Sequence, residues 1–165
     1  MKKKHFHERE LDKIDLKILK WLQKNGRMAM TELAEKVGLS TTPCTERVRR
    51  LEREGIIEGY HASINPHALG ASLLVFVEIK LSAKSGDIFD AFRREVRNIP
   101  EILECHLVSG EYDYLIKARL PDMSMYRKLL GEILLQLPHA NESRSYVVME
   151  EVKETSMLPL PESLI

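Results

Sequence analysis

The sequence has little cysteine and no long apolar run. Its 165 residues include only two cysteines, Cys44 and Cys105. These lie far apart in apolar periodic segments, which gives no disulfide framework and no metal-ligand spacing. Such cysteine usage is typical of a reducing cytoplasm. The longest apolar run, residues 71–77, is interrupted by a serine and falls well short of the roughly 18 residues that span a membrane. We therefore expect a cytoplasmic protein with no membrane partner and no metal.

The sequence also lacks a net charge, but its charges are unevenly distributed. It contains 25 Lys+Arg and 25 Asp+Glu. Residues 1–60 hold 14 basic and 10 acidic side chains, and residues 61–165 hold 11 and 15. This asymmetry favours contact of the first part with a polyanion and a different role for the second part. Because 44% of the residues are hydrophobic, the chain can fill real cores, which excludes disorder as its default state.

Residues 11–64 show the pattern of a helix-turn-helix domain. After a first amphipathic helix, a second helix is expected with Thr31 as its cap, and the turn Gly38-Leu39-Ser40 interrupts the apolar pattern. A new apolar stripe then predicts a third, strongly basic helix. This order of short helix, tight turn and basic helix is that of a helix-turn-helix, which we place at about residues 30–49. An extended strand is expected over residues 56–64.

The third helix is predicted to present hydroxyl and arginine side chains to solvent. With about 100° per residue, an apolar stripe at Cys44, Val48 and Leu51 leaves the opposite side of the helix exposed. Hydroxyls and guanidinium groups suit the major groove and the phosphates beside it. The alternative is a solvated face held by charge pairs such as Glu46 with Arg50. The candidate DNA-binding residues are Ser40, Thr42, Thr45, Glu46, Arg47, Arg49 and Arg50.

Arg47 has the weakest case among these candidates. Its helical phase places it beside the buried stripe, so a packing role or an ion pair within the domain competes with a phosphate contact. Arg49 and Arg50 rank above it because both are expected to point to solvent. Ser40 and Thr42, at the start of the helix, are suited to phosphate contacts through the positive end of the helix dipole.

From Ser72 onwards, strands and helices alternate in the order β-α-β-β-α-β. Two strand-helix-strand units predict a four-stranded antiparallel sheet with both helices on one face, the ferredoxin-like arrangement, so the fold class is α+β. The first strand is apolar on both faces, and two helices cover only one of them. The other face is therefore expected to pack on a second copy of the chain, as a homodimer. The predicted strands cover residues 72–81, 102–109, 114–120 and 143–152; residues 65–71 are a linker, residues 1–10 an arm and residues 154–165 a loose tail.

Six segments carry a family resemblance. They are LDKIDLKILKWLQKNGR, TELAEKVGLSTTPCTERVRRLEREGII, NPHALGASLLVFVEI, ECHLVSGEYDYLIKARLPDM, YRKLLGE and YVVMEEVK. Together they resemble the Lrp/AsnC family of transcriptional regulators over almost everything from Leu11 to Lys153. The resemblance implies a winged helix-turn-helix at residues 11–64 that binds double-stranded DNA. It also implies a ferredoxin-like domain at residues 72–153 that dimerises, assembles into tetramers, octamers or higher forms, and binds an amino acid, with leucine as the expected effector.

The resemblance also implies an effector site at the turn Gly110-Glu111-Tyr112-Asp113, where dimers meet. An amino acid needs an anion for its ammonium group, N–H groups for its carboxylate and an apolar wall. Asp113, Gly110 and the pair Leu107/Val108 offer those groups. One alternative is that Asp113 only caps the turn. Another is that Met123 and the segment Tyr146-Val147-Val148 belong to the core or to an interface between subunits. Glu111 departs from the commoner Asp of the family and lengthens the reach of the charge. The candidate effector residues are Leu107, Val108, Gly110, Glu111, Asp113, Met123, Tyr146, Val147 and Val148.

The leading hypothesis is a DNA-binding transcriptional regulator, located in the cytoplasm with the nucleoid, whose assembly responds to leucine. One alternative is a low-specificity architectural DNA-binding protein, against which the absence of net positive charge counts. The other is an enzyme on a ferredoxin-like fold. Residues 104–113 contain acids and a histidine but no nucleophile–base pair and no phosphate loop, so we assign no catalytic residue and no cofactor.

Overall fold

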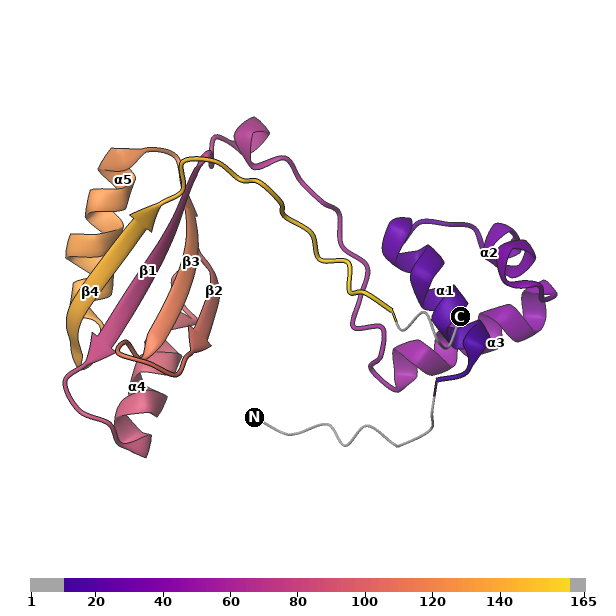
Figure 1. Ribbon diagram of the computed structural model, residues 1–165, viewed down its shortest axis with the longest axis horizontal. Helices are drawn as coiled ribbons and strands as arrows, with labels where there is room; N and C mark the ends of the chain where they lie inside the picture. Colours follow the sequence, from indigo (N-terminus) through magenta and orange to yellow (C-terminus); the bar gives the residue numbers. More distant parts are fainter. Residues whose placement is uncertain (1–10, 161–165) are drawn as a thin grey trace. The chain divides into compact units, whose positions relative to one another are not determined.

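The computed structural model describes residues 11–160, apart from the side chains of Ile133 and Leu135. The predicted arm, residues 1–10, and the last five residues of the tail lie outside the described residues. Figure 1 shows helices at the N-terminal end of the chain and a sheet with its own helices in the later part. The chain divides into two compact units: residues up to 63 together with those from 154 onwards, and residues 64–153.

The first unit contains three helices, as the sequence predicts. They are α1 (Lys13–Lys24), α2 (Met30–Val37) and α3 (Thr41–Arg53). Helix α1 begins at a capping box, in which Asp12 accepts from the backbone of Asp15 while the Asp15 side chain accepts from the backbone of Asp12. The cap expected at Thr31 is wrong, because α2 already begins at Met30 after Ala29.

A short left-handed connection joins α2 to α3. Helix α2 ends at Gly38, whose φ of +76° is the left-handed conformation that glycine adopts without steric cost. The apolar stripe of α3 then packs into one core with residues from α1 and α2. Ile18, Leu33 and Leu51 in this core are fully buried.

The strand predicted over residues 56–64 is absent from this part of the described chain. Ile56 and Ile57 pack on the three-helix core, and the following residues, up to the short 3-10 helix at Pro66–Leu69, are exposed and without regular structure. A strand needs a neighbour for its N–H and C=O groups. No described segment of this chain pairs with residues 56–64, so an extended sequence pattern is not sufficient there.

The tail is less loose than predicted over its described part. Residues 154–160 have no regular structure, but Leu158 is joined to α1. The side chain of Gln23 donates to the Leu158 carbonyl at 3.2 Å and accepts from the Leu158 N–H at 2.7 Å. The tail therefore returns to the first unit, in which the chain begins.

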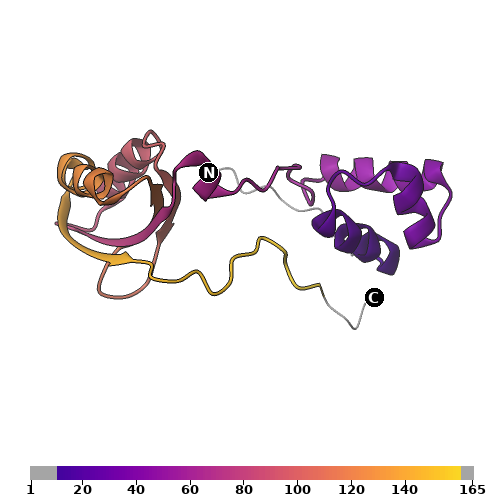
Figure 2. The same cartoon turned by 90° about the horizontal axis from the view of Figure 1, so that it is seen from above.

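The second unit has the predicted β-α-β-β-α-β order. Its four strands form one antiparallel sheet in the order β2-β3-β1-β4. Helices α4 and α5 lie on the same face of that sheet (Figure 2). The elements are β1 (Leu73–Leu81), α4 (Gly86–Val96), β2 (Ile102–Leu107), β3 (Tyr114–Leu120), α5 (Met123–Lys128) with a π-helical turn (Leu129–Ile133) and a 3-10 turn (Leu134–Gln136), and β4 (Ala140–Val147).

The last strand begins and ends earlier than the predicted 143–152. It pairs with β1 from Leu81 opposite Ala140 to Val75 opposite Val147. Because β1 starts at Leu73, the ladder runs out of partners soon after Val147, and only Val148 continues it, donating to Leu74 at 3.0 Å. The position of β4 is therefore set by its neighbour and not by its own pattern of side chains.

The two faces of the sheet differ in chemistry. Alternate residues of β1 and β3, among them Val77 and Ile116, form the core under α4 and α5. On the opposite face Phe76 lies between Lys117 of β3 and Tyr146 of β4. Tyr146 donates to Glu78 at 3.0 Å on the same face. Apolar and charged side chains therefore share this second face.

Candidate DNA-binding and effector sites

Helix α3 exposes one continuous stripe of side chains. Thr42, Glu46, Arg49 and Arg53 are exposed and follow one another at helical spacing on the side opposite the buried stripe. Ser40, at the N-cap, is also exposed. Four of the predicted DNA-binding residues are therefore accessible from solvent: Ser40, Thr42, Glu46 and Arg49.

Thr45 is half-buried beside this stripe. Its hydroxyl donates to the Thr41 carbonyl one turn earlier at 2.8 Å. The hydroxyl hydrogen is thus used within the helix, and only the oxygen lone pairs remain to accept a hydrogen bond.

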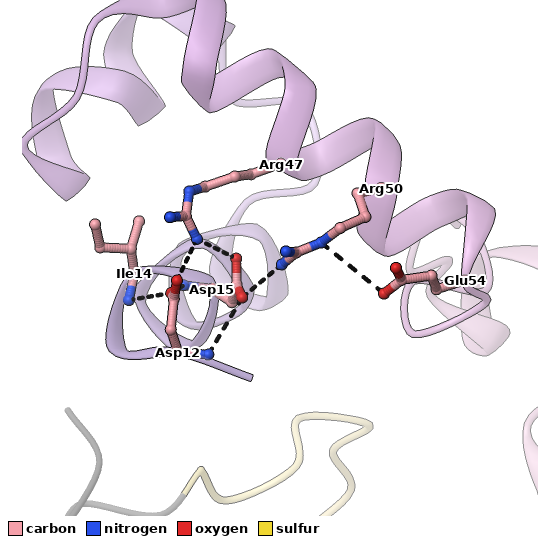
Figure 3. Close-up of polar contacts among 6 residues, drawn as sticks. All are labelled: Asp12, Ile14, Asp15, Arg47, Arg50 and Glu54. Atoms are coloured by element: carbon pink, nitrogen blue, oxygen red, sulfur yellow. Dashed lines mark hydrogen bonds and ion pairs between the residues drawn. The ribbon is translucent and has the colours of Figure 1, made fainter. Parts of the chain in front are cut away.

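Arg47 and Arg50 point away from the exposed stripe and towards the start of α1 (Figure 3). Arg47 Nη1 lies 2.5 Å from Asp12 Oδ2 and 2.9 Å from Asp15 Oδ1, and Arg50 Nη2 lies 2.5 Å from Asp15 Oδ2. The expectation that Arg50 points to solvent is wrong. Arg50 lies about 100° further round the helix than Arg49, from which its long side chain reaches back to α1. The alternative interpretation of Arg47, an ion pair within the domain, is confirmed.

The network formed by Asp12, Asp15, Arg47 and Arg50 is partly shielded from solvent. The Asp15 side chain is 1% exposed, and the side chains of Arg47 and Arg50 are 28% and 21% exposed. Burial opposes ionisation of Asp12, but the backbone N–H of Asp15 and the Arg47 guanidinium outweigh it, so the pKa of Asp12 lies below its ordinary value. Hydrogen bonds to Asp12 and Asp15 raise the pKa of Arg47. Asp12 and Arg47 thus remain ionised at neutral pH.

The end of β2 and the turn that leads to β3 hold five of the predicted effector residues. Gly110 is exposed with a φ of +138°, and the exposed Glu111 lies 3.9 Å from Lys80. Leu107 is exposed, whereas Val108 is half-buried and donates from its N–H to the Asp113 carbonyl at 2.9 Å.

Asp113 is not an open carboxylate, contrary to its predicted role as the anion for a ligand. It is 4% exposed; its Oδ2 accepts from the Leu81 N–H at 2.8 Å, and its Oδ1 lies 2.9 Å from Lys84 Nζ. Burial opposes its ionisation, but the bond from Leu81 and the Lys84 charge prevail, so the pKa of Asp113 lies below its ordinary value. These contacts tie the turn to the end of β1, whereas the alternative predicted from the sequence was that Asp113 caps the turn itself.

The remaining predicted effector residues lie at the other end of the sheet. Val147 is opposite Val75, whereas the Asp113 N–H donates to Ile79. At about 3.4 Å per residue, four positions along β1 separate the two groups by about 14 Å. Within one copy of the chain, the two groups therefore start from different ends of β1. The second group comprises Met123, which is exposed at the start of α5, with Tyr146, Val147 and Val148.

Two acidic residues that matter for α3 were missed by the sequence analysis. Asp12 and Asp15, in the first turn of α1, supply the carboxylates for Arg47 and Arg50. Their spacing was readable as a cap, but their partners lie more than thirty positions away in the sequence. Elsewhere in residues 11–160 there is no group of three or more His, Cys, Asp or Glu side chains that could hold a metal, and no helix long and apolar enough to cross a membrane.

A three-helix unit with a polar exposed stripe on its third helix, joined to a ferredoxin-like unit, defines a class of protein: a DNA-binding regulator with a separate sensory domain. Comparison with known families gives the same division. Residues 11–58 match the winged helix-turn-helix DNA-binding family, and residues 74–158 match the Lrp/AsnC ligand binding domain. The chain belongs to the Lrp/AsnC family of transcriptional regulators, and the enzyme alternative is set aside.

Individual relatives agree with this assignment. The chain is 61% identical over 150 residues to the leucine-responsive regulatory proteins of Salmonella typhimurium and Escherichia coli K12, which covers 91% of this chain and 92% of each of theirs. Among solved structures, a transcriptional regulator from Neisseria meningitidis in complex with L-Met has a TM-score of 0.89 at 37% identity, covering 94% of this chain and 100% of that one. An AsnC family regulator from Agrobacterium tumefaciens has a TM-score of 0.85 at 34% identity, covering 90% and 96%.

Proposed function

We propose that the amino acid to which this regulator responds is leucine and that leucine changes its assembly on DNA. The observation that carries the proposal is the 61% identity, over nearly the whole chain, to relatives named leucine-responsive regulatory protein. A second relative, at 37% identity, is a complex with L-Met. Methionine is therefore the competitor against which leucine must be compared. As a DNA-binding regulator, the protein would act in the cytoplasm, with the nucleoid.

The proposed effector site lies between copies of the chain. The predicted effector residues form two groups about 14 Å apart along β1, and a pocket between two copies can take one group from each copy. Glu111 is the exposed carboxylate of the β2–β3 turn and is available for a ligand's ammonium group, while Asp113 holds the turn in shape. A ligand that binds only between copies favours the larger assembly by its differential affinity. Homodimers that form tetramers or octamers would supply such sites.

The proposed DNA-reading face consists of the exposed residues at the start and along the outer side of α3. Thr42, Glu46 and Arg49 face the groove, and Ser40 lies at the positive end of the helix. Arg47 and Arg50 are excluded from this face because their guanidinium groups are held by carboxylates of α1.

A gel-shift assay on genomic fragments tests the function as a whole. Binding is measured with no amino acid, with leucine, with methionine and with alanine as a control, alongside sedimentation of the free protein. We expect leucine to change both the pattern of complexes and the distribution of assemblies. An equal response to alanine, or none to leucine, would refute the proposed effector. Equal affinity for genomic fragments and for a random duplex would favour the architectural alternative.

Arg49→Ala tests the reading face. Loss of an exposed guanidinium that meets a base should weaken binding by about 1–3 kcal/mol, with the fold unchanged. The matched control is Arg97→Ala, which removes the same charge from an exposed position at the end of α4. If both variants bind the preferred fragment like the parent at matched salt, α3 does not read DNA through Arg49.

A further inference from the structure

The residues that hold Arg47 and Arg50 are part of the same cap that starts α1. Asp12 Oδ1 accepts from the N–H groups of Ile14 and Asp15, while its Oδ2 pairs with Arg47. Asp15 Oδ2 accepts from the Asp12 N–H and from Arg50. The carboxylates are therefore fixed by the backbone of α1 before either arginine binds them. This rigidity makes the site a fixed anchor for α3.

The Arg50 guanidinium is held by contacts within the first unit. Its Nε is buried without a hydrogen-bond partner and lies 3.9 Å from Glu54, and its Nη2 lies 2.5 Å from Asp15. Moving Arg50 and Arg47 to a phosphate would leave the carboxylate of Asp15, 1% exposed, without a cation. A buried carboxylate without a partner is strongly unfavourable. The two arginines therefore stay with Asp15 when DNA binds.

We propose that Asp15 is a positioning residue that sets DNA specificity by keeping Arg47 and Arg50 off the DNA. Contacts of arginine with phosphate strengthen binding to any sequence equally, whereas base contacts distinguish sequences. Because Asp15 holds Arg47 and Arg50, these two cations do not add sequence-independent contacts with phosphate. Discrimination between DNA sequences then depends on the exposed stripe of α3. This inference rests on the proposed reading face, which Arg49→Ala tests separately.

The test uses the full-length chain with Asp15→Asn, which keeps the size of the side chain and an acceptor oxygen but removes its charge. Binding to a random-sequence duplex and to the best-bound genomic fragment is measured over a salt series, with folding followed by circular dichroism. Each guanidinium that reaches a phosphate steepens the slope of log K against log salt by about 0.9. We expect a slope steeper by about 0.9–1.8. Affinity for the random duplex should rise roughly eight- to sixtyfold at 0.1 M salt, and preference for the genomic fragment should fall.

Two further variants keep the result decisive. Glu35→Gln makes the same change in net charge at an exposed position of α2 and should leave the slope unchanged. Arg50→Met removes an arginine that, on this proposal, does not touch DNA, so its slope should equal that of the parent. An unchanged slope for a folded Asp15→Asn, or an equal steepening in Glu35→Gln, would overturn the proposal. If Asp15→Asn does not fold, Arg50→Met decides: a slope shallower by about 0.9 would show that Arg50 contacts DNA in the parent.

Discussion

Replacing Asp113 with alanine should weaken the second unit measurably, because Asp113 ties the β2–β3 turn to the end of β1. The substitution leaves the buried Leu81 N–H, now bonded at 2.8 Å, without an acceptor, which costs about 1–3 kcal/mol. The pair with Lys84 adds less than about 1 kcal/mol, because the Lys84 side chain is 60% exposed. We therefore expect a loss of about 1–4 kcal/mol in the free energy of unfolding.

Asp113→Asn separates the two roles weighed for this residue. Asparagine keeps an oxygen that accepts from Leu81 but cannot pair with a cation, so the loss in stability should be only about 1 kcal/mol. If Asp113 serves to hold the turn, this variant keeps its response to leucine. Thermal or urea unfolding is measured beside sedimentation with and without leucine, and Lys84→Ala is the matched control. An Asp113→Ala variant that unfolds like the parent would refute the structural role, and a stable Asp113→Asn variant that ignores leucine would restore the ligand role.

The pH dependence of this contribution has a definite sign. The pKa of Asp113 is lower in the folded protein than its ordinary value, so the folded state binds its proton less readily than the unfolded state. The stability that its charge supplies is therefore complete above the unfolded value of about 3.9 and is lost as the pH falls through the folded pKa. The difference in stability between the parent and Asp113→Asn should be full at pH 7 and should shrink below about pH 4.

Two further predictions concern one turn and one whole unit. Gly38→Ala should destabilise the first unit by about 1–2 kcal/mol, because φ at this position is +76°, which is unfavourable for alanine. No atom lies within 4 Å of the added methyl group, so the loss of stability comes from the backbone conformation and not from a steric clash. An unchanged melting temperature would contradict this. A fragment of residues 64–153 should fold alone, remain at least dimeric and not bind DNA, because it contains the complete sheet with an uncovered face. A monodisperse monomer at micromolar concentration in ultracentrifugation would place the dimer contact elsewhere.

Periodicity predicted the parts of this protein that depend on local pattern. The buried positions of α3 follow directly from the spacing of Cys44, Val48 and Leu51, and the β-α-β-β-α-β order follows from alternating periods of two and 3.6. Helical phase also identified Arg49 as exposed. It failed for Arg50 because phase gives the direction in which Cα–Cβ points, while a long side chain ends where its charge finds a partner.

The errors share a physical cause, which is dependence on a distant partner. The segment 56–64 has the composition of a strand but no neighbour among the described residues, and β4 is displaced towards Ala140 by the position of β1. From the sequence, Asp113 is expected to offer a free carboxylate to a ligand. In the structure, this carboxylate is bonded to the Leu81 N–H and paired with Lys84. In each case the deciding group is remote in sequence, so no local pattern reports it.

The strand order of the second unit has a consequence for the time at which each function becomes available during synthesis. In the first unit the ion pair between Asp15 and Arg50 spans 35 positions, whereas in the second the bond between Glu78 and Tyr146 spans 68. Contacts between positions that are distant in the sequence form slowly. Because β1 lies between β3 and β4, one edge of β1 has no partner until β4 has been made. The sheet therefore stays incomplete until this last strand has emerged from the ribosome. The three helices that bind DNA are complete long before then. A newly made chain therefore has its DNA-binding helices before it has the sheet through which amino acids would control them.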